Sequence, residues 1–287
     1  MNIVLIIGQN KSPNRFEKSV NIFKNNSDIY KIIIVTWEST EIDDNIMDII
    51  NNNSKFCINR VIDIELPPSE HGYNSCMYQK HLYDIGLEYI KQDFDTKNLF
   101  ILKTRMDVLI NTNQLEFIFN QNYKIPDNDS EIQYKIWIAW THVTKPFYVE
   151  DACFYSHFSV MGKLITDRRV RLVEIGQGRS HIRWFFYFAK LFNIYKEPYI
   201  CYENLQEKFH LDNTKKQLLI NYKKCINKHF IVKTVENGIV FQHWNDFNFF
   251  NYYKPPSNNI NDIINQYYAC NLKIVHNMED FNSIIIK

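Results

Sequence analysis

Three charged side chains follow an apolar run near the middle of the chain, and their types suit the binding of an anion. Residues 98–110 read Asn-Leu-Phe-Ile-Leu-Lys-Thr-Arg-Met-Asp-Val-Leu-Ile, so Lys103, Arg105 and Asp107 come directly after the apolar run. Such a run, followed at once by charges, is typical of a buried central strand. Ligands of open α/β sheets bind at the carboxyl ends of their strands. Two cations and one carboxylate could hold a phosphate group there, with or without a divalent metal, whereas solvated charges at an ordinary strand end are the alternative.

Two earlier apolar runs also end in polar residues that could contact a nucleoside. A glycine lets backbone N–H groups approach a ligand closely, a glutamine can bind a base or ribose through hydrogen bonds, and a tryptophan can stack on a ring. The alternative is that the tryptophan caps the core and the glutamine forms a turn. The phosphate-loop pattern and the dinucleotide pattern G-x-G-x-x-G are both absent, which argues against nicotinamide or flavin binding. The candidates are Gly8, Gln9 and Asn10 after the first run, and Thr36, Trp37 and Glu38 after the second.

A pair of carboxylates in an apolar setting is the candidate general base. Glu150 and Asp151 lie between Phe-Tyr-Val and Ala-Cys-Phe. Desolvation there could raise the pKa of one carboxyl group and make it a base. A helix N-cap or a salt bridge is the alternative.

Two histidines are weaker candidates. His243 ends an apolar run and could bind a metal together with Asp107, although a satisfied core histidine is the more common case. His181 opens an aromatic-rich stretch, 181–192, and is a candidate contact for an acceptor substrate. The aromatic side chains of that stretch are more typical of a core than of a sugar-binding platform.

The elements that must position these residues alternate along the first 110 residues. Apolar runs predict strands at 3–7, 32–35, 61–66 and 99–102, the third of them stopped by two prolines. Ser12 and Pro13 predict the start of a helix, with Ser12 as its N-cap. Helices are further expected at 43–50 and at 74–91, where Tyr78, Leu82, Ile85 and Tyr89 would form the apolar stripe and Gln79 and Lys80 would lie off it. This alternation predicts a mainly parallel sheet with helices on both faces, in which 3–7, 32–35 and 99–102 are adjacent buried strands.

The second half is less regular. Helical patterns are expected at 114–119, 181–192, 217–228 and 260–268, strands at 136–140 and 239–244, and a strand end followed by a helix start at 154–165. No repeat and no linker interrupts the chain, so one α/β domain with an irregular helical C-terminal part is expected.

Composition narrows the class of protein. The chain has 287 residues, and 45% of them are hydrophobic. Its net charge of +1 provides no strong positive potential to attract nucleic acid. The six cysteines are scattered and form no C-x-x-C pair, so structural zinc is not expected. We expect buried thiols in a reducing cytoplasm instead. The first residues look like a strand and not a signal peptide, and no apolar run is long enough to span a membrane.

The ordered motifs of the chain resemble those of the WavE-type lipopolysaccharide-synthesis glycosyltransferases. Ile34-Val35-Thr36-Trp37-Glu38 is similar to that family's Thr-Trp-Glu motif, which follows an opening strand ending in Gln-Gly where this chain has Gly8-Gln9. The family's Asn-x-x-x-x-Gln helix is matched by Asn74 and Gln79, and its Lys-x-Arg-Ser-Asp strand end by Lys103, Arg105 and Asp107. A later Asp beside aromatic residues is matched loosely by Asp151. The resemblance covers about residues 3–164.

The resemblance implies a GT-A-type fold and the transfer of a sugar from a nucleotide-diphosphate sugar to a lipopolysaccharide, capsule or other glycan or glycolipid acceptor. Residues 1–110 would bind the nucleotide sugar, and 111–287 would form the acceptor side and the C-terminal decoration. Asp107 would hold the diphosphate through Mn²⁺ or Mg²⁺, and Arg105 and Lys103 would offset its charge. Asp151, or else Glu150, would be the base of an inverting reaction. A cytoplasmic protein is implied, with peripheral membrane contact allowed; another nucleotide-using transferase and a non-catalytic glycan- or protein-binding module stay open.

Overall fold

The computed structural model describes residues 1–64, 73–126, 132–138, 141–142, 153–164, 191–192, 213–232, 274–275 and 278–283. The first half alternates strands and helices as the sequence predicts. Its elements are β1 (Asn2–Ile7), α1 (Pro13–Asn25), β2 (Ile29–Trp37), α2 (Asp44–Asn51), β3 (Phe56–Val61), α3 (Tyr73–Asp93), η2 (Thr96–Asn98), β4 (Phe100–Arg105) and α4 (Thr112–Phe119).

The second half adds shorter elements, of which three strands join the strands of the first half in one sheet and two strands pair with each other in a separate two-stranded sheet. They are β5 (Ile136–Ile138), β6 (Thr141–His142), β7 (Phe154–His157), α5 (Phe158–Met161), η3 (Gly162–Leu164), α7 (Asn213–His229), β8 (Phe230–Val232), β9 (Ile274–Val275) and α10 (Met278–Ser283). The strand and helix expected within 154–165 and the helix at 217–228 are confirmed. The stretches 181–190, 239–244 and 260–268 lie outside the described residues.

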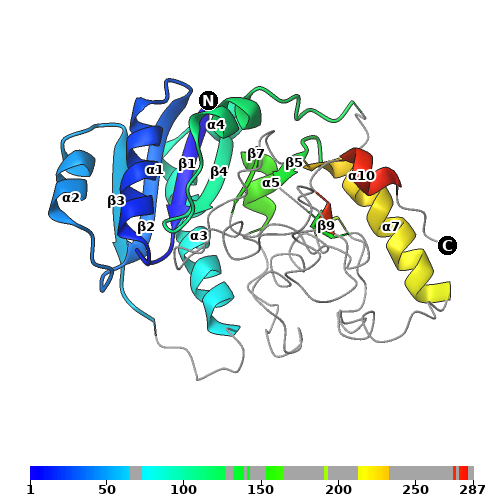
Figure 1. The fold of residues 1–287 in the computed structure, drawn as a ribbon, viewed down its shortest axis with the longest axis horizontal. Helices are drawn as coiled ribbons and strands as arrows, with labels where there is room; N and C mark the ends of the chain where they lie inside the picture. The colour runs from blue at the N-terminus through cyan, green and yellow to red at the C-terminus, as the bar shows by residue number, and fades with distance from the viewer. Residues whose placement is uncertain are drawn as a thin grey trace, which may run out of the picture.

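One mixed sheet organises the described part of the chain, with strand order β3-β2-β1-β4-β7-β5-β8. β1 pairs in parallel with β2 and with β4, β2 pairs in parallel with β3, and β7 runs antiparallel to both β4 and β5. The prediction that the three apolar runs form adjacent buried strands is therefore confirmed. Figure 1 shows these strands in the blue-to-green part of the molecule, with α7 and α10 beyond the opposite end of the sheet.

Helices cover the sheet because each has one apolar face. α1 buries Phe16, Val20 and Phe23 completely, as predicted, and it is drawn in front of the sheet in Figure 1. α3 packs on the sheet face that carries Leu5 and Val35, because Gly86 lets the helix approach these two side chains. Successive strand residues point to opposite faces, and both Val4 and Leu5 are fully buried, so both faces of β1 are covered.

Two sequence-based expectations are wrong in detail. The third strand is Phe56–Val61 and not 61–66, because parallel pairing with β2 joins Ile32 to Phe56 and Trp37 to Val61. The predicted start of α1 is confirmed, since Ser12 is its N-cap and a proline follows. The Ser12 side chain makes no capping hydrogen bond, and its carbonyl oxygen accepts the first backbone bonds.

The second error concerns the stripe of α3. Gln79 and Lys80 are buried on the packed side of the helix, next to the fully buried Leu82 and Tyr83, whereas Tyr78, Ile85 and Tyr89 are only partly buried. The packed side is therefore rotated by about one residue from the one that the apolar pattern predicts. It brings two polar side chains towards the sheet.

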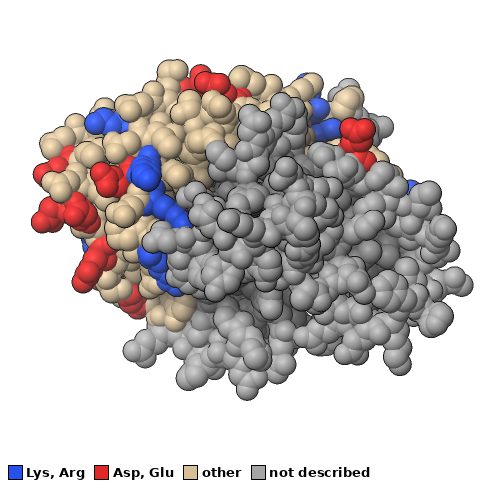
Figure 2. Space-filling model, in the orientation of Figure 1, with Lys and Arg blue, Asp and Glu red and all other residues tan. Residues whose placement is uncertain are grey.

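Three cysteines and the charged surface of the described residues complete the description of the fold. Cys153 and Cys225 are buried, Cys57 is half-buried, and none of these three is in a disulfide. No helix in the described part of the chain is long and apolar enough to cross a membrane. Acidic side chains gather over the α2 end of the face in Figure 2, with a band of basic side chains beside them, so neither sign covers the described part of that face.

Candidate functional site

The carboxyl ends of β1, β2 and β4 meet at one edge of the sheet, which we call the rim. Ile7 pairs with Val35 on one side and with Arg105 on the other. Gly8, which follows Ile7, therefore lies between the ends of β2 and β4, with Thr36 on its β2 side. The convergence of these three strand ends, predicted from the alternation of strands and helices, is confirmed.

Gly8 makes the turn that leaves β1 at the rim. Its φ of +115° lies in the region that favours glycine, and no atom lies within 4 Å of the position where a Cβ would stand. Its N–H donates to the carbonyl oxygen of Val35 (3.3 Å), and its own carbonyl oxygen accepts from the Thr36 hydroxyl (2.7 Å). Thr36 is completely buried. Its position suits support of the Gly8 turn better than direct contact with a ligand.

Trp37 is packed against the first half of α3. Its ring stacks on His81, with centroids 5.7 Å apart and planes 8° apart, and meets Tyr78 edge-on at 5.6 Å. Only 3% of Trp37 is exposed. The ring therefore caps the core, which was the alternative to stacking on a base. Sequence reasoning missed His81 and Tyr78 as its partners, because they lie about forty residues further along the chain.

Two buried polar atoms near the end of β2 have no hydrogen-bond partner among the described residues. Asn10 donates its Nδ2 group to the carbonyl oxygen of Glu41 (3.2 Å), and its Oδ1 atom is buried without a partner. The hydroxyl of Thr40 is likewise buried and unpaired. Buried polar atoms are nearly always hydrogen-bonded, so these two are suited to pair with polar groups of a ligand. Thr40 was missed from the sequence, although it stands in the polar run that follows Trp37.

Arg60 is a further residue that the sequence reasoning missed. Its Nη1 group donates to the carbonyl oxygens of Glu38 and Thr40, both at 3.2 Å, and so fixes the loop after β2. The expected strand at 61–66 placed Arg60 ahead of the strand, whereas it lies at the carboxyl end of β3. The side chains of Glu38 and Gln9 are exposed beside this loop.

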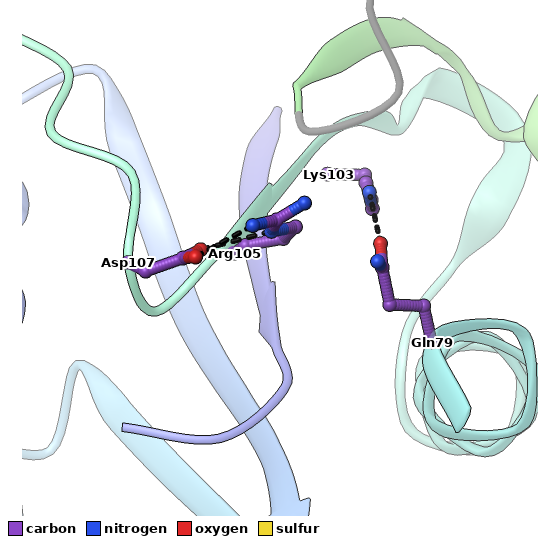
Figure 3. Close-up of polar contacts among 4 residues, drawn as sticks. All are labelled: Gln79, Lys103, Arg105 and Asp107. Atoms are coloured by element: carbon purple, nitrogen blue, oxygen red, sulfur yellow. Dashed lines mark hydrogen bonds and ion pairs between the residues drawn. The ribbon is translucent and has the colours of Figure 1, made fainter. Parts of the chain in front are cut away.

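Lys103 is a completely buried cation in the middle of the sheet. Its Nζ atom lies 3.4 Å from Oε1 of Gln79 on α3 and 5.1 Å from the ring centroid of Phe154 on β7. Figure 3 shows Lys103 and Gln79 pointing towards each other across the gap between β4 and α3. Because Lys103 and Arg105 are two residues apart on one strand, both point to the same face of the sheet. The rim therefore carries two cations on the α3 side.

Arg105 and Asp107 form a two-pronged ion pair. Nε of Arg105 donates to Oδ1 of Asp107 at 2.8 Å, and Nη2 donates to Oδ2 at 2.5 Å. Figure 3 shows the guanidinium and carboxylate groups facing each other just beyond the end of β4. The side chains are 13% and 6% exposed, so the pair is largely buried. The charges after β4 are thus not solvated, and the pair can orient the arginine towards an anion.

The described residues do not fit a divalent metal site. Mg²⁺ and Mn²⁺ prefer several oxygen ligands, often with one or two carboxylates among them. Both oxygens of Asp107 accept hydrogen bonds from Arg105, and no group of three or more His, Cys, Asp or Glu residues gathers in the described part of the chain. The second expected ligand, His243, lies outside that part.

The remaining site predictions cannot be placed against this rim. Glu150, Asp151 and His181 lie outside the described residues, and Asn74 is in the first turn of α3, where its side chain is not described. The described chain resumes at Cys153, beside the carboxyl end of β4, because Phe154 pairs with Lys103. The roles of these four residues stay predictions.

Comparison with known proteins gives structural likenesses at low sequence identity. No family model and no curated protein matches the chain. A galactosyltransferase, LgtC, in complex with donor and acceptor sugar analogs is 10% identical, with a TM-score of 0.40, over 85% of this chain and 87% of that one. TarS residues 1–349 from S. aureus is 10% identical, with a TM-score of 0.39, over 79% of this chain and 72% of that one. A cytidylyltransferase from Leptospira borgpetersenii is 16% identical, with a TM-score of 0.36, over 66% of this chain and 71% of that one. Likenesses at these values assign neither an activity nor a substrate.

Proposed function

We propose that this protein is a GT-A-like glycosyltransferase that moves a sugar from a nucleotide-diphosphate sugar to a glycan or glycolipid acceptor, such as a lipopolysaccharide, capsule or other surface glycan. The observation that carries the proposal is the pair of cations on the α3 side of the rim. Lys103 is fully buried and Arg105 nearly so. Cations form charge-assisted hydrogen bonds to phosphate, and these two lie at the end of the sheet where ligands of open α/β sheets bind, so they favour an anionic ligand.

The chemistry of sugar transfer matches these cations. As the bond between the sugar and the diphosphate breaks, negative charge builds up on the departing phosphate oxygens. Fixed positive groups aimed at those oxygens stabilise that charge more than they stabilise the intact donor. We assign this role to Arg105 and Lys103, with Gln79 holding Lys103 from α3 through the contact between Oε1 and Nζ.

The nucleoside would lie over the ends of β1 and β2. Gly8 leaves open space beside the chain, and Asn10 Oδ1 and Thr40 Oγ1 offer unpaired polar atoms in the described part of the rim. Gln9 and Glu38 are exposed at the same edge and are assigned to the donor as well. Thr36 and Trp37 would act by support, through the Gly8 turn and the packing of α3.

The acceptor side rests on residues beyond the described ones. Asp151, with Glu150 as the substitute, is proposed as the base that takes the proton from the acceptor hydroxyl, and His181 as an acceptor contact. Support for Asp151 comes from its place in the sequence, shortly before β7, whose first residue pairs with Lys103. The sequence-based prediction of Mn²⁺ or Mg²⁺ held by Asp107 and His243 is a competing hypothesis for how the diphosphate is bound, and it requires Arg105 to release Asp107.

Calorimetric titration of UDP, CDP, GDP and dTDP, and of the matching nucleosides, tests the proposal. The wild-type protein is expected to bind at least one of the diphosphates. Lys103→Met and Arg105→Ala are expected to weaken diphosphate binding by at least tenfold and to leave nucleoside binding nearly unchanged, because charge-assisted bonds reach only the phosphates.

The matched control is Lys91→Met, which removes an exposed lysine of α3. Lys91 lies about 18 Å along the helix from Gln79, the residue that contacts Lys103. It is expected to change neither affinity. If no diphosphate binds to the wild-type protein, a donor site is absent and the proposal fails. Equal losses of diphosphate and nucleoside binding in the Arg105 variant would contradict the role given to the guanidinium.

A further inference from the structure

The ion pair at the end of β4 bears on how the proposed donor site handles the charge of a diphosphate. We propose that Asp107 is a positioning residue for Arg105 and not a metal ligand, so that the rim binds a nucleoside diphosphate without a divalent cation. The inference rests on the proposed function, since it names the means by which that site neutralises its ligand.

The geometry of the pair is the first argument. Nε and Nη2 of Arg105 donate to different oxygens of Asp107, at 2.8 and 2.5 Å. This parallel arrangement fixes the plane of the guanidinium as well as its position. A metal ion at Asp107 would need at least one of the same oxygens, and taking it would leave a largely buried arginine with a weakened partner.

The backbone around Asp107 is the second argument, because it holds the carboxylate where it meets Arg105. The N–H of Met106 donates to the carbonyl oxygen of Ile7 (3.2 Å), and the N–H of Val108 donates to that of Arg105 (3.2 Å). The carbonyl oxygen of Val108 accepts from the Ser19 hydroxyl on α1 (3.0 Å). The turn after β4 is therefore tied to β1 and to α1 on either side of Asp107. Such a turn suits a fixed partner for Arg105 better than a ligand that must reorient towards a metal.

The inventory of ligands and charges is the third argument. A divalent cation would need further oxygen or nitrogen ligands. Within the described ranges, no three His, Cys, Asp or Glu side chains gather in a group that could hold a metal ion. Positive charge is already present, because Lys103 and Arg105 point to the same face two residues apart. Two cations can offset the charge that a metal would otherwise carry.

The experiment measures the affinity of UDP, CDP, GDP and dTDP for the whole protein, by calorimetry, in EDTA and again with Mn²⁺ or Mg²⁺. For the diphosphate that binds, the dissociation constants in the two conditions are expected to agree within about twofold. This arm uses only the wild-type protein, so it does not depend on the folding of any variant.

A double-mutant cycle tests the positioning role. Asp107→Asn and Arg105→Lys are each expected to weaken diphosphate binding by about tenfold or more, in EDTA and in metal alike, and the double variant is expected to be little worse than either single one. Asp107→Glu, which keeps the charge, is expected to recover part of the affinity. Melting temperatures check that each variant is folded, and nucleoside affinity, which a general structural defect would also lower, is expected to stay constant.

Two outcomes overturn the inference in different ways. If affinity rises tenfold or more with Mn²⁺ or Mg²⁺, and Asp107→Asn abolishes that rise while Arg105→Lys retains it, Asp107 is a metal ligand and only the inference fails. If none of the four diphosphates binds in either condition, the proposed function fails and the inference falls with it.

Discussion

Gly86 of α3 and Leu5 of β1 are in such close contact that a Cβ at position 86 would stand 2.5 Å from Cδ1 of Leu5. The same Cβ would lie 3.2 Å from Cγ2 of Val35. Both neighbours are fully buried and cannot move into solvent. The contact fixes how closely α3 approaches the sheet, and hence how Gln79 reaches Lys103.

Gly86→Ala is expected to lower the free energy of unfolding by about 1–3 kcal/mol, because overpacking a filled core forces side chains or the helix to shift. Chemical denaturation measures this change. Gly162→Ala is the control: the nearest atom to its Cβ would belong to the half-buried ring of Phe158, at 3.3 Å, and its backbone conformation is helical. That variant is expected to stay within about 1 kcal/mol of the wild type. Equal effects of the two substitutions would contradict the assigned packing.

Lys55 closes the end of α1. Its Nζ group donates to the carbonyl oxygens of Phe23 and Lys24 (3.3 Å each) and of Asn26 (2.5 Å). The last carbonyls of a helix lack partners within the helix and carry partial negative charge. Lys55→Met is therefore expected to lower the free energy of unfolding by about 1 kcal/mol. Urea titration measures it beside Lys91→Met, and a Lys55 variant as stable as this control would contradict the capping role.

The strands that could be predicted from the sequence are those whose side chains are buried on both faces. Residues 3–7 and 32–35 are continuous apolar runs, and no other element explains such runs as simply. The edge strand β3 was placed five residues late, because Phe56–Val61 is only partly buried and carries polar residues at its carboxyl end. β8 was missed because it has three residues and directly follows α7.

The residue types of the candidate site could be predicted, but their partners could not. The polar ends of β1, β2 and β4 are visible as breaks in apolar runs. The burial of Trp37 depends on His81, and the position of Lys103 depends on Gln79 and Phe154, contacts that join distant parts of the chain. Gln79 was assigned to the polar side of α3, because periodicity alone does not reveal that a buried polar side chain has a buried charge to meet.

His157 predicts a pH dependence of stability. Its Nδ1 atom accepts the N–H of Ser159 (3.2 Å), and its Nε2 atom lies 3.1 Å from the carbonyl oxygen of Lys97, so the neutral ring with a proton on Nε2 satisfies both contacts. Burial lowers the pKa of His157 below its ordinary value, and the nearby N-terminal charge lowers it further, against the raising effect of the bond to Lys97. The unfolded chain therefore binds the proton more readily than the folded one.

This difference stabilises the folded protein fully above the ordinary histidine pKa, about 6.5, and the stabilisation is lost as the pH falls through the lower folded-state pKa. Free energies of unfolding are to be compared at pH 7.5 and pH 5 for the wild type and for His157→Asn, which can still cap α5 but does not titrate. The wild type is expected to lose more stability on acidification than the variant. Parallel losses would show that other groups cause the dependence.

Asp151→Asn tests the proposed base. The substitution keeps the shape of the side chain and removes its basicity, so turnover is expected to fall by about 10²–10⁴ while donor affinity stays nearly constant. Glu150→Gln is the companion variant, and it is expected to retain most of the activity. Near-normal turnover in the Asp151 variant, with a large loss in the Glu150 variant, would move the base to Glu150. Steady-state kinetics and donor titrations on both variants provide the measurements.

The burial of Lys103 opposes the stability of the fold to the activity of the proposed site. A lysine that is 0% exposed inside a sheet costs more to desolvate than an apolar side chain of the same length, so selection for stability alone has a reason to favour an apolar residue, with matching changes around it, at this position. A population of variants selected only for resistance to heat would then drift towards an apolar residue at this position and lose the proposed transferase on the way. Lysine would then persist at position 103 under selection for growth and would be lost under selection for stability alone. This difference would show that the lysine is kept for its function and not for the fold.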